Sequence, residues 1–284
     1  MNELKQRITS GLLMAMMLVV SVFGNATTTN AATLTADQYL AKMAKVNAKT
    51  KSVEMSQSTT VNMTMNGQTI SSKASGSGII FFNSGKAKYV QKITVKAADQ
   101  KRTQTIRMYV KKSGGKLYLY TSEDGKTYQK EKLGDMADFT SQLGQVDTSA
   151  YSNAKIVKKS VKVGKVDTVQ ISCSITGEDM QNAVNQAGVD VSALYEMGLD
   201  FSTMKPIKVT YLIDKKTYRP VKCSVDMTAF MNDLFTTLMN GFADDDETAA
   251  AIGSLAFTCT TAKSTVVYKN FNKAKSFSYP KAVK

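Results

Sequence analysis

The stretch from Ile207 to Met227 constrains the fold more than any other part of the chain. Apolar side chains occupy every second position on both sides of a polar turn at residues 214–218, and Pro220 opens the second half, where its missing N–H does least harm. The apolar positions are Ile207, Val209, Tyr211, Ile213, Val221, Cys223, Val225 and Met227. This pattern predicts a β-hairpin with one apolar face, which either covers packed side chains or lines a cavity.

The same two-residue period occurs in five earlier segments, at residues 53–65, 70–82, 87–97, 103–111 and 116–121. Glycine-containing turns separate them, beginning with Asn66-Gly67, a pair typical of a tight hairpin. We therefore expect an antiparallel meander of five strands. Gly76 and Gly78 lie inside the second segment, where glycine permits strong twist or a bulge.

Helical spacing of apolar residues alternates with these strand patterns. It predicts helices at residues 35–50, 135–143, 177–199 (a pair broken near Gly188) and 229–242, the last with a broad apolar stripe. Thr35 is suited to cap the first of them. A lysine-rich hairpin turns at residues 163–165, and a last long strand is expected at residues 255–268, before an irregular tail.

The first thirty-one residues have the features of a secretory signal peptide. Lys5 and Arg7 precede the apolar run 12–23, and small residues follow up to Ala31, the expected cleavage point, with Ala26 as the alternative. We expect residues 1–31 to be removed and residues 32–284 to form a single domain that is secreted to the cell envelope. No cysteine lies near the cleavage point, so a lipid anchor is not expected.

Residues that commonly carry catalysis or hold metals are scarce. The chain has no histidine, and it lacks the short motifs of serine hydrolases, phosphate-binding loops and zinc proteases. We expect no enzymatic activity, no metal site and no cofactor. The acidic run 244–247 is interpreted as the N-terminal cap of a short helix, with a calcium site as the alternative.

Three cysteines and a large positive charge leave alternatives open. Cys173, Cys223 and Cys259 fall in the apolar phase of their strands and are expected to be buried thiols, with a Cys223–Cys259 bridge as the alternative. The net charge is +14, which favours contact with anionic envelope polymers or lipid head groups, although lysines scattered along strands are also typical of a solvated sheet face. Nucleic acid is not an expected partner of an exported chain without a binding motif.

Two short motifs resemble the lipoprotein-carrier superfamily, a group of exported lipid-binding proteins. In VTYLIDKKTYRPVKCSVDM (residues 209–227) a strand ends in Asp214, and Pro220 starts the next; KLYLYTSEDGKTYQK (residues 116–130) joins a strand, an acidic-glycine turn and an aromatic residue. The resemblance implies an α+β fold: a single strongly curved antiparallel sheet, an open half-barrel, with helices packed on its concave side. It also implies a hydrophobic cavity that holds acyl chains.

The residues and the resemblance together predict a non-catalytic carrier of a lipid or another amphipathic molecule, in which helix 229–242 is a movable cover and lysines meet an anionic head group. The methionines favour this reading, because flexible thioethers suit varied apolar ligands. The alternative is a module of the same fold without a ligand, which binds an envelope protein or an anionic polymer through its basic surface. The predicted cavity-lining residues are Met55, Met63, Met65, Tyr211, Ile213, Val221, Val225, Met227, Phe230, Leu234, Phe235, Leu238 and Met239.

Overall fold

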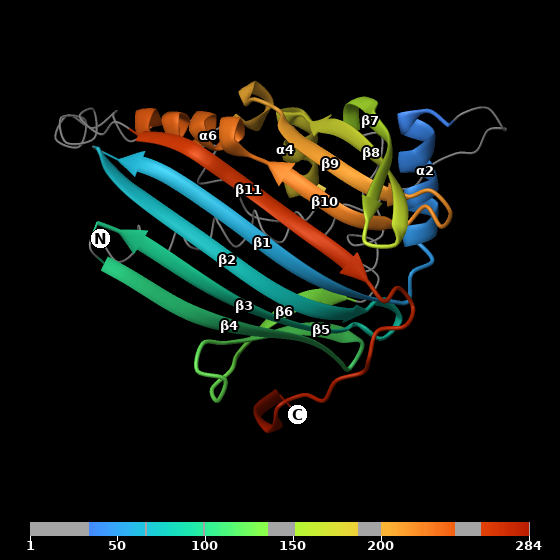
Figure 1. Cartoon of the computed structure of the whole chain (residues 1–284). Helices are drawn as coiled ribbons and strands as arrows, with labels where there is room; N and C mark the ends of the chain where they lie inside the picture. The colour runs from blue at the N-terminus through green and yellow to red at the C-terminus, as the bar shows by residue number, and fades with distance from the viewer. Residues whose placement is uncertain are drawn as a thin grey trace.

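Eleven antiparallel strands form one sheet in this computed structural model, which describes residues 34–65, 67–98, 100–135, 151–186, 200–241 and 257–283. The strands are β1 (Ser52–Met65), β2 (Gln68–Phe81), β3 (Lys86–Ala97), β4 (Gln100–Ser113), β5 (Lys116–Ser122), β6 (Gln129–Asp135), β7 (Tyr151–Val163), β8 (Val166–Ile175), β9 (Ile207–Asp214), β10 (Pro220–Asp226) and β11 (Phe257–Lys269). Their spatial order is β6-β5-β4-β3-β2-β1-β11-β10-β9-β8-β7 (Figure 1). The sheet is open, since β6 and β7 do not pair with each other.

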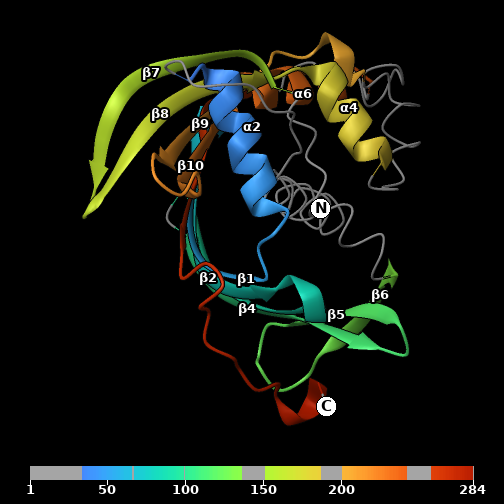
Figure 2. The ribbon, with the colours of Figure 1, turned by 90° about the vertical axis from the view of Figure 1, so that its right-hand side faces the viewer.

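The sheet is strongly curved, and the helices lie on its concave side (Figure 2). They are α2 (Ala36–Asn47), α4 (Gly177–Gln186) and α6 (Thr228–Gly241), with short 3-10 turns at Phe82–Ser84, Phe201–Thr203 and Lys281–Val283. Alternate residues of β1, β2 and β7–β11 face this side and form the main hydrophobic core with residues of the helices, such as Leu40 and Phe230. The predicted open half-barrel with helices on its concave face is therefore confirmed.

The first helix begins where its cap was predicted. The Thr35 hydroxyl accepts a hydrogen bond from the backbone N–H of Gln38, and the Gln38 side chain accepts one from the N–H of Thr35, which completes a capping box. Leu40, Met43 and Ala44 form the buried stripe of α2. The helix ends at Asn47, three residues before the predicted end, and the chain turns directly into β1.

The predicted five-stranded meander corresponds to β1–β5, but the sequence reading missed a sixth strand, β6. Its sequence, QKEKLGD, is polar except for Leu133, and that side chain is 41% exposed. A strand at the edge of a sheet that buries neither face does not need alternating apolar and polar residues. The sequence of β6 therefore gave no sign of a strand. Lysines on both edge strands, β6 and β7, discourage pairing with another chain.

Gly76 and Gly78 make room for a tyrosine ring and do not form the bulge that glycine permits. The pairing of β2 with β1 and with β3 runs through both glycines without a register shift. A Cβ atom on Gly76 would lie 2.3 Å from the Tyr89 hydroxyl oxygen, and one on Gly78 would lie 2.6 Å from Cδ2 of the same ring. Tyr89 of β3 therefore lies flat across β2, and its hydroxyl donates to Gln57 Oε1 of β1 at 2.8 Å.

The hairpin β9–β10 has the predicted turn. Asp214 ends β9 and accepts hydrogen bonds from the Lys216 N–H and the Thr217 hydroxyl. Ile207, Val209, Tyr211 and Ile213 are all buried, as their period predicts. In β10 the register shifts between Pro220 and Lys222, so that Pro220 is opposite Ile213, and Val221 is only half-buried at the irregularity.

The three cysteines are free and buried, which confirms the prediction of buried thiols. The alternative Cys223–Cys259 bridge is wrong, because Cys223 is opposite Val266 on β11, seven residues along the strand from Cys259, which pairs with Met63. Predictions for residues 136–143, 187–199 and 244–252, and for the signal peptide, lie outside the described residues. Among those described, no helix has the length and apolar character needed to cross a membrane.

The C-terminal tail crosses to the convex side of the sheet. Phe277, Tyr279 and Val283 pack there against Tyr109 of β4 and Tyr120 of β5, in a second and smaller core cluster. The Tyr279 hydroxyl donates to the Val110 carbonyl oxygen at 2.9 Å, and the ammonium group of Lys86 lies 4.4 Å above the Phe277 ring. The predicted irregular tail is thus an ordered strap.

Candidate functional site

The concave face brings together most of the residues that were predicted to line a cavity. Seven of them are buried in the main core: Met55, Met63, Tyr211, Ile213, Val225, Met227 and Phe230. Leu234 packs partly buried against that core, Phe235 is partly buried with its ring centroid 4.1 Å from that of Phe257, and Val221 lies at the β10 irregularity. The side chains of Met65, Leu238 and Met239 lie outside the described part of the structure.

A pair of tyrosines forms the polar centre of the core under β7–β10. The hydroxyls of Tyr151 and Tyr211 are 2.8 Å apart, and their rings meet edge to face. Burial raises the pKa of both phenols well above the ordinary value, and it raises the pKa of the neighbouring Cys223 thiol to about 12. Near neutral pH these groups are therefore uncharged and contribute hydrogen bonds without nucleophilic character.

The predicted cover helix is fastened to the sheet at its N-terminal end. The side chain of Asn232 donates to the Cys259 carbonyl oxygen at 2.8 Å and accepts from the Cys259 N–H at 2.7 Å. The Thr228 hydroxyl accepts from the Ala262 N–H at 2.9 Å. These bonds pair backbone N–H and C=O groups of β11 next to the register shift at Asn62/Met63. They hold the first turns of α6 in place.

A buried polar network interrupts the apolar face in the middle of the sheet. The Gln57 amide donates to the hydroxyls of Thr59 and Ser264, which are 2.9 Å from each other, and it accepts from Tyr89. The sequence reading did not include Gln57 and Thr59, although they have the same odd-numbered phase as Val53, Met55 and Val61. The two-residue period of β1 alone would have placed both side chains on the buried face. Their polar character suggested a solvent-exposed position instead.

Among the described residues, the buried polar side chains share one property: none is charged. They are Asn47, Thr50, Ser52, Gln57, Thr59, Ser72, Gln91, Ser122, Thr168 and Ser264. Neither polar atom of the Asn47 side chain at the end of α2 has a hydrogen-bond partner among the described residues. The Nε atom of Arg219, a partly buried residue, is the other buried polar atom without a partner among the described residues. The fully buried side chains described here therefore offer uncharged donors and acceptors.

The described side chains form no cluster suited to metal binding. Within the described ranges, no group of three or more histidine, cysteine, aspartate or glutamate side chains could hold a metal ion. Desolvation raises the pKa of the Cys173 thiol to about 12, so this thiol is protonated in the same way as Cys223. What the geometry provides is an apolar concave surface with a neutral polar centre.

Residues 35–240 match DUF6612, described as a family of unknown function. The chain belongs to this family. The match runs from the cap of α2 into α6, so the DUF6612 region includes ten of the eleven strands, all but β11. No curated protein matches the chain.

Two solved structures resemble this DUF6612 protein weakly. A DUF1329 family protein from Desulfovibrio piger ATCC 29098 is 8% identical, with a TM-score of 0.25, over 85% of this chain and 93% of the other. A β-barrel-like protein of the domain of unknown function DUF1849 from Brucella abortus is also 8% identical, with a TM-score of 0.21, over 78% and 99% of the two chains. The resemblance to the lipoprotein-carrier superfamily stays a prediction.

Proposed function

We propose that this protein is exported and acts as a non-catalytic binding protein, which holds a lipid or another amphipathic molecule between the concave face of the sheet and the helices. One observation carries the proposal: an open, strongly curved sheet presents a mostly apolar concave face, interrupted by one neutral polar network, and helices lie on that face. Ligand sites are typically concave and mostly apolar, with a few placed polar groups.

The composition of this face supports an adaptable site. Methionines from strand β1, from the end of β10 and from two helices contribute to the core: Met43, Met55, Met63, Met180 and Met227. Thioether side chains are flexible and polarisable, and they can repack around ligands of different shape. Each methylene group of an acyl chain that leaves water would contribute about 0.8 kcal/mol to binding.

The neutral interior restricts the polar part of the ligand. The buried polar groups are amides and hydroxyls, and an uncompensated charge beside them would be costly. We therefore propose that any part of the ligand beside Gln57, Thr59 and Ser264 is uncharged, such as an ester or a hydroxyl. Lysines would then meet an anionic group only outside the core.

Ligand uptake can be measured with a matched pair of variants on one strand. Met55 faces the core, whereas its neighbour Ser56 faces the opposite side and is exposed. With a fluorescent monoacylglycerol as the probe, Met55→Trp should weaken binding at least about tenfold, because an indole would fill the space of the acyl chain. Ser56→Trp should bind as the wild type does.

A second variant guards against a folding defect in the first. Met55→Gln changes the side-chain volume little and places an amide against the apolar chain of the ligand. It should retain the far-ultraviolet circular dichroism of the wild type and lose affinity. Native mass spectrometry of protein purified from its own host should also show a bound apolar compound. Protein that is empty and takes up no acyl probe would contradict the proposal.

A further inference from the structure

The convex face of the sheet carries a row of hydroxyl side chains that crosses six neighbouring strands. Strand pairing places them directly opposite one another, from β8 through β9, β10, β11 and β1 to β2. The row is Ser172, Thr210, Ser224, Thr265, Ser58 and Ser75, and it continues to Lys155 at one end and to Lys92 and Thr105 at the other. Neighbouring strands are about 4.8 Å apart, so the hydroxyls form a regular ladder.

The adjacent rows add positive charge to this ladder. One row contains Ser174, Lys208, Asp226, Lys263, Thr60, Lys73, Thr94 and Thr103; the other contains Gln170, Leu212, Lys222, Val267, Ser56, Ser77, Val90, Arg107 and Ser122. Asp226 is the one carboxylate in the three rows, and it is paired with Lys263 at 3.1 Å. Within the described residues, no other cation of these rows forms an ion pair.

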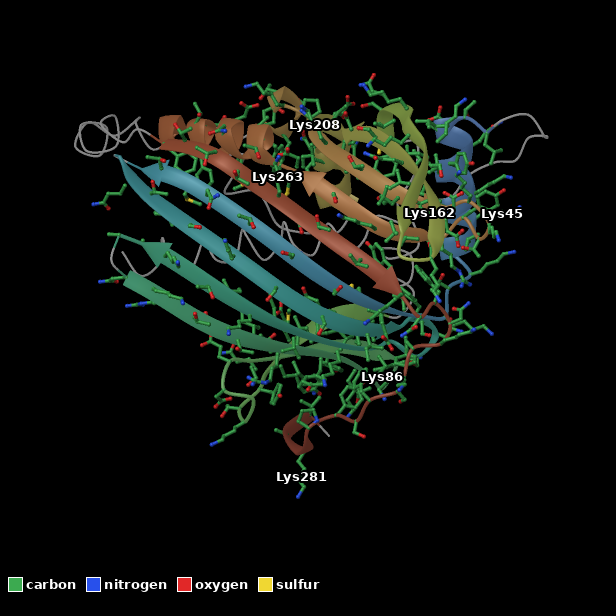
Figure 3. The ribbon with its side chains drawn as sticks, viewed as in Figure 1. Lys45, Lys86, Lys162, Lys208, Lys263 and Lys281 are labelled. Atoms are coloured by element: carbon green, nitrogen blue, oxygen red, sulfur yellow. The ribbon has the colours of Figure 1, made fainter. Side chains whose placement is uncertain are left out.

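The face is open to solvent and lies opposite the proposed ligand site. Ser58, Ser75, Lys73, Lys92, Lys208 and Lys263 are all exposed. Figure 3 shows Lys208 and Lys263 on the side of the sheet turned toward the viewer, and Figure 2 shows the helices behind it on the other side. Edge protection explains lysines on β7, Lys155 included, but the other lysines of these rows lie on interior strands.

We propose that this convex face, defined by the three rows, binds an acidic polysaccharide chain. The lysines complement its carboxylates, and the hydroxyl ladder complements its hydroxyl groups. The strand spacing of about 4.8 Å is close to the length of one sugar unit in an extended polysaccharide, so successive sugars can meet successive strands.

The shape of the face favours this partner over two other polyanions. A flat lipid bilayer touches a strongly curved convex surface only along a narrow strip, whereas a flexible chain can follow the curvature. Single-stranded nucleic acid is normally held by aromatic rings on which its bases stack. The three rows contain no aromatic side chain, and the convex-side tyrosines Tyr109 and Tyr120 are covered by the C-terminal tail.

Binding of the whole protein to polygalacturonate at about 50 mM and about 200 mM salt tests the proposal. The triple variant Lys73→Gln, Lys92→Gln, Lys208→Gln should weaken binding about tenfold at the lower salt and flatten the salt dependence. The control variant Lys45→Gln, Lys49→Gln, Lys281→Gln removes the same charge from exposed positions outside the rows and should change affinity less than about twofold.

A second variant separates the hydroxyl ladder from the charge. Ser58→Val with Ser75→Val keeps the net charge and introduces good strand formers, so it should fold and should weaken binding about threefold with an unchanged salt slope.

Single-stranded DNA, phosphatidylglycerol vesicles and neutral dextran are the competing probes. The proposal would be overturned if both lysine variants lost the same affinity for polygalacturonate, or if DNA or vesicles bound as tightly as polygalacturonate. It would also be overturned if the protein did not bind polygalacturonate at all. Acyl-probe uptake should stay normal in every one of these variants, which separates this test from that of the proposed function.

Discussion

The two halves of the sheet are covered from opposite sides and by different means. On the half formed by β7–β11, helices pack against the concave face and build a continuous apolar core around Tyr211 and Ile213. On the half formed by β3–β5, the C-terminal tail packs against the convex face with a few aromatic rings. The first half is held by buried area contributed from many elements, whereas the described cover on the convex face of the second half is one short segment.

This difference leads to different expectations for stability. A core that many elements share should determine the global free energy of unfolding, because no part of it opens alone. A strap that covers two or three strands should control only their local opening. The five predictions below, ordered by expected effect, test whether the halves are unequal in this way.

The largest effect is expected from a cavity in the helix-covered half. Ile213 is fully buried, so Ile213→Ala should lower the free energy of unfolding by about 3 kcal/mol in urea titrations. Tyr279→Ala in the tail-covered half should cost about 1 kcal/mol, because that side chain is only partly buried. Equal losses from the two substitutions would contradict the comparison.

Gly76 lies on β2, where the two halves join. In Gly76→Ala the new methyl group would overlap the Tyr89 hydroxyl, displace the ring and break its bond to Gln57, at an expected cost of about 2 kcal/mol. The double variant Gly76→Ala with Tyr89→Ala should recover part of this loss, as denaturant titration would reveal. No recovery would mean that the glycine is required for its backbone and not for the ring.

The Tyr151–Tyr211 pair should show strong coupling. Either single change to Phe leaves a buried hydroxyl without its partner and should cost about 1.5 kcal/mol, whereas the double change to Phe should cost less than the two single changes together. A double-mutant cycle of unfolding free energies measures this coupling. Strict additivity would show that the two hydroxyls do not depend on each other.

The buried thiols should make the helix-covered half sensitive to alkali. Desolvation raises the pKa of Cys223 to about 12 in the folded protein, while an exposed cysteine has a pKa of about 8.5. Because the folded thiol keeps its proton while the unfolded one releases it, this contribution is fully present below about pH 8.5 and is lost as pH rises toward 12.

Between about pH 8 and about pH 9.5, ionisation of Cys223 in the unfolded chain should by itself lower the free energy of unfolding by about 1 kcal/mol. Cys223→Ala should flatten the dependence of the unfolding free energy on pH in this window by that amount. An unchanged slope in the variant would show that other groups, such as Tyr89 and Cys173, account for the whole effect.

The smallest global effect is expected from removal of the strap. A chain that ends at Lys275 lacks Phe277, Tyr279 and Val283 and uncovers Tyr109. Amide hydrogen exchange should become faster in β4 and β5 and stay unchanged in β8 and β9, with little change in the global unfolding midpoint. Faster exchange throughout the sheet would show that the tail belongs to the main core.

The sequence could predict which faces are buried, but not how the strands align. The period of two from Ile207 to Ile213 and the cap at Thr35 are local properties, and both are confirmed. The register shift at Val221 and the position of Cys223 opposite Val266 depend on pairing between distant segments. For the same reason, the hydroxyl ladder of the convex face could not be recognised before the pairings were known.

Residue type was misleading where tertiary packing reversed its usual meaning. Gln57 and Thr59 are polar, yet they are buried because hydroxyl and amide partners from β3 and β11 satisfy them. Gly76 permits unusual backbone conformations, but it is needed here for the space that Tyr89 occupies. The predicted cavity-lining residues gather on one face as expected, whereas their role in binding stays a prediction.

The pairing of β1 with β11 has a consequence for how the chain folds. Strands β1–β6 form one run of neighbouring hairpins and β7–β11 another, and the two runs meet only along this single ladder between the first and the last strand. Contacts so distant in sequence form slowly. During synthesis β1 therefore remains an unpaired edge, open to association with other chains, until almost the entire sequence has been made.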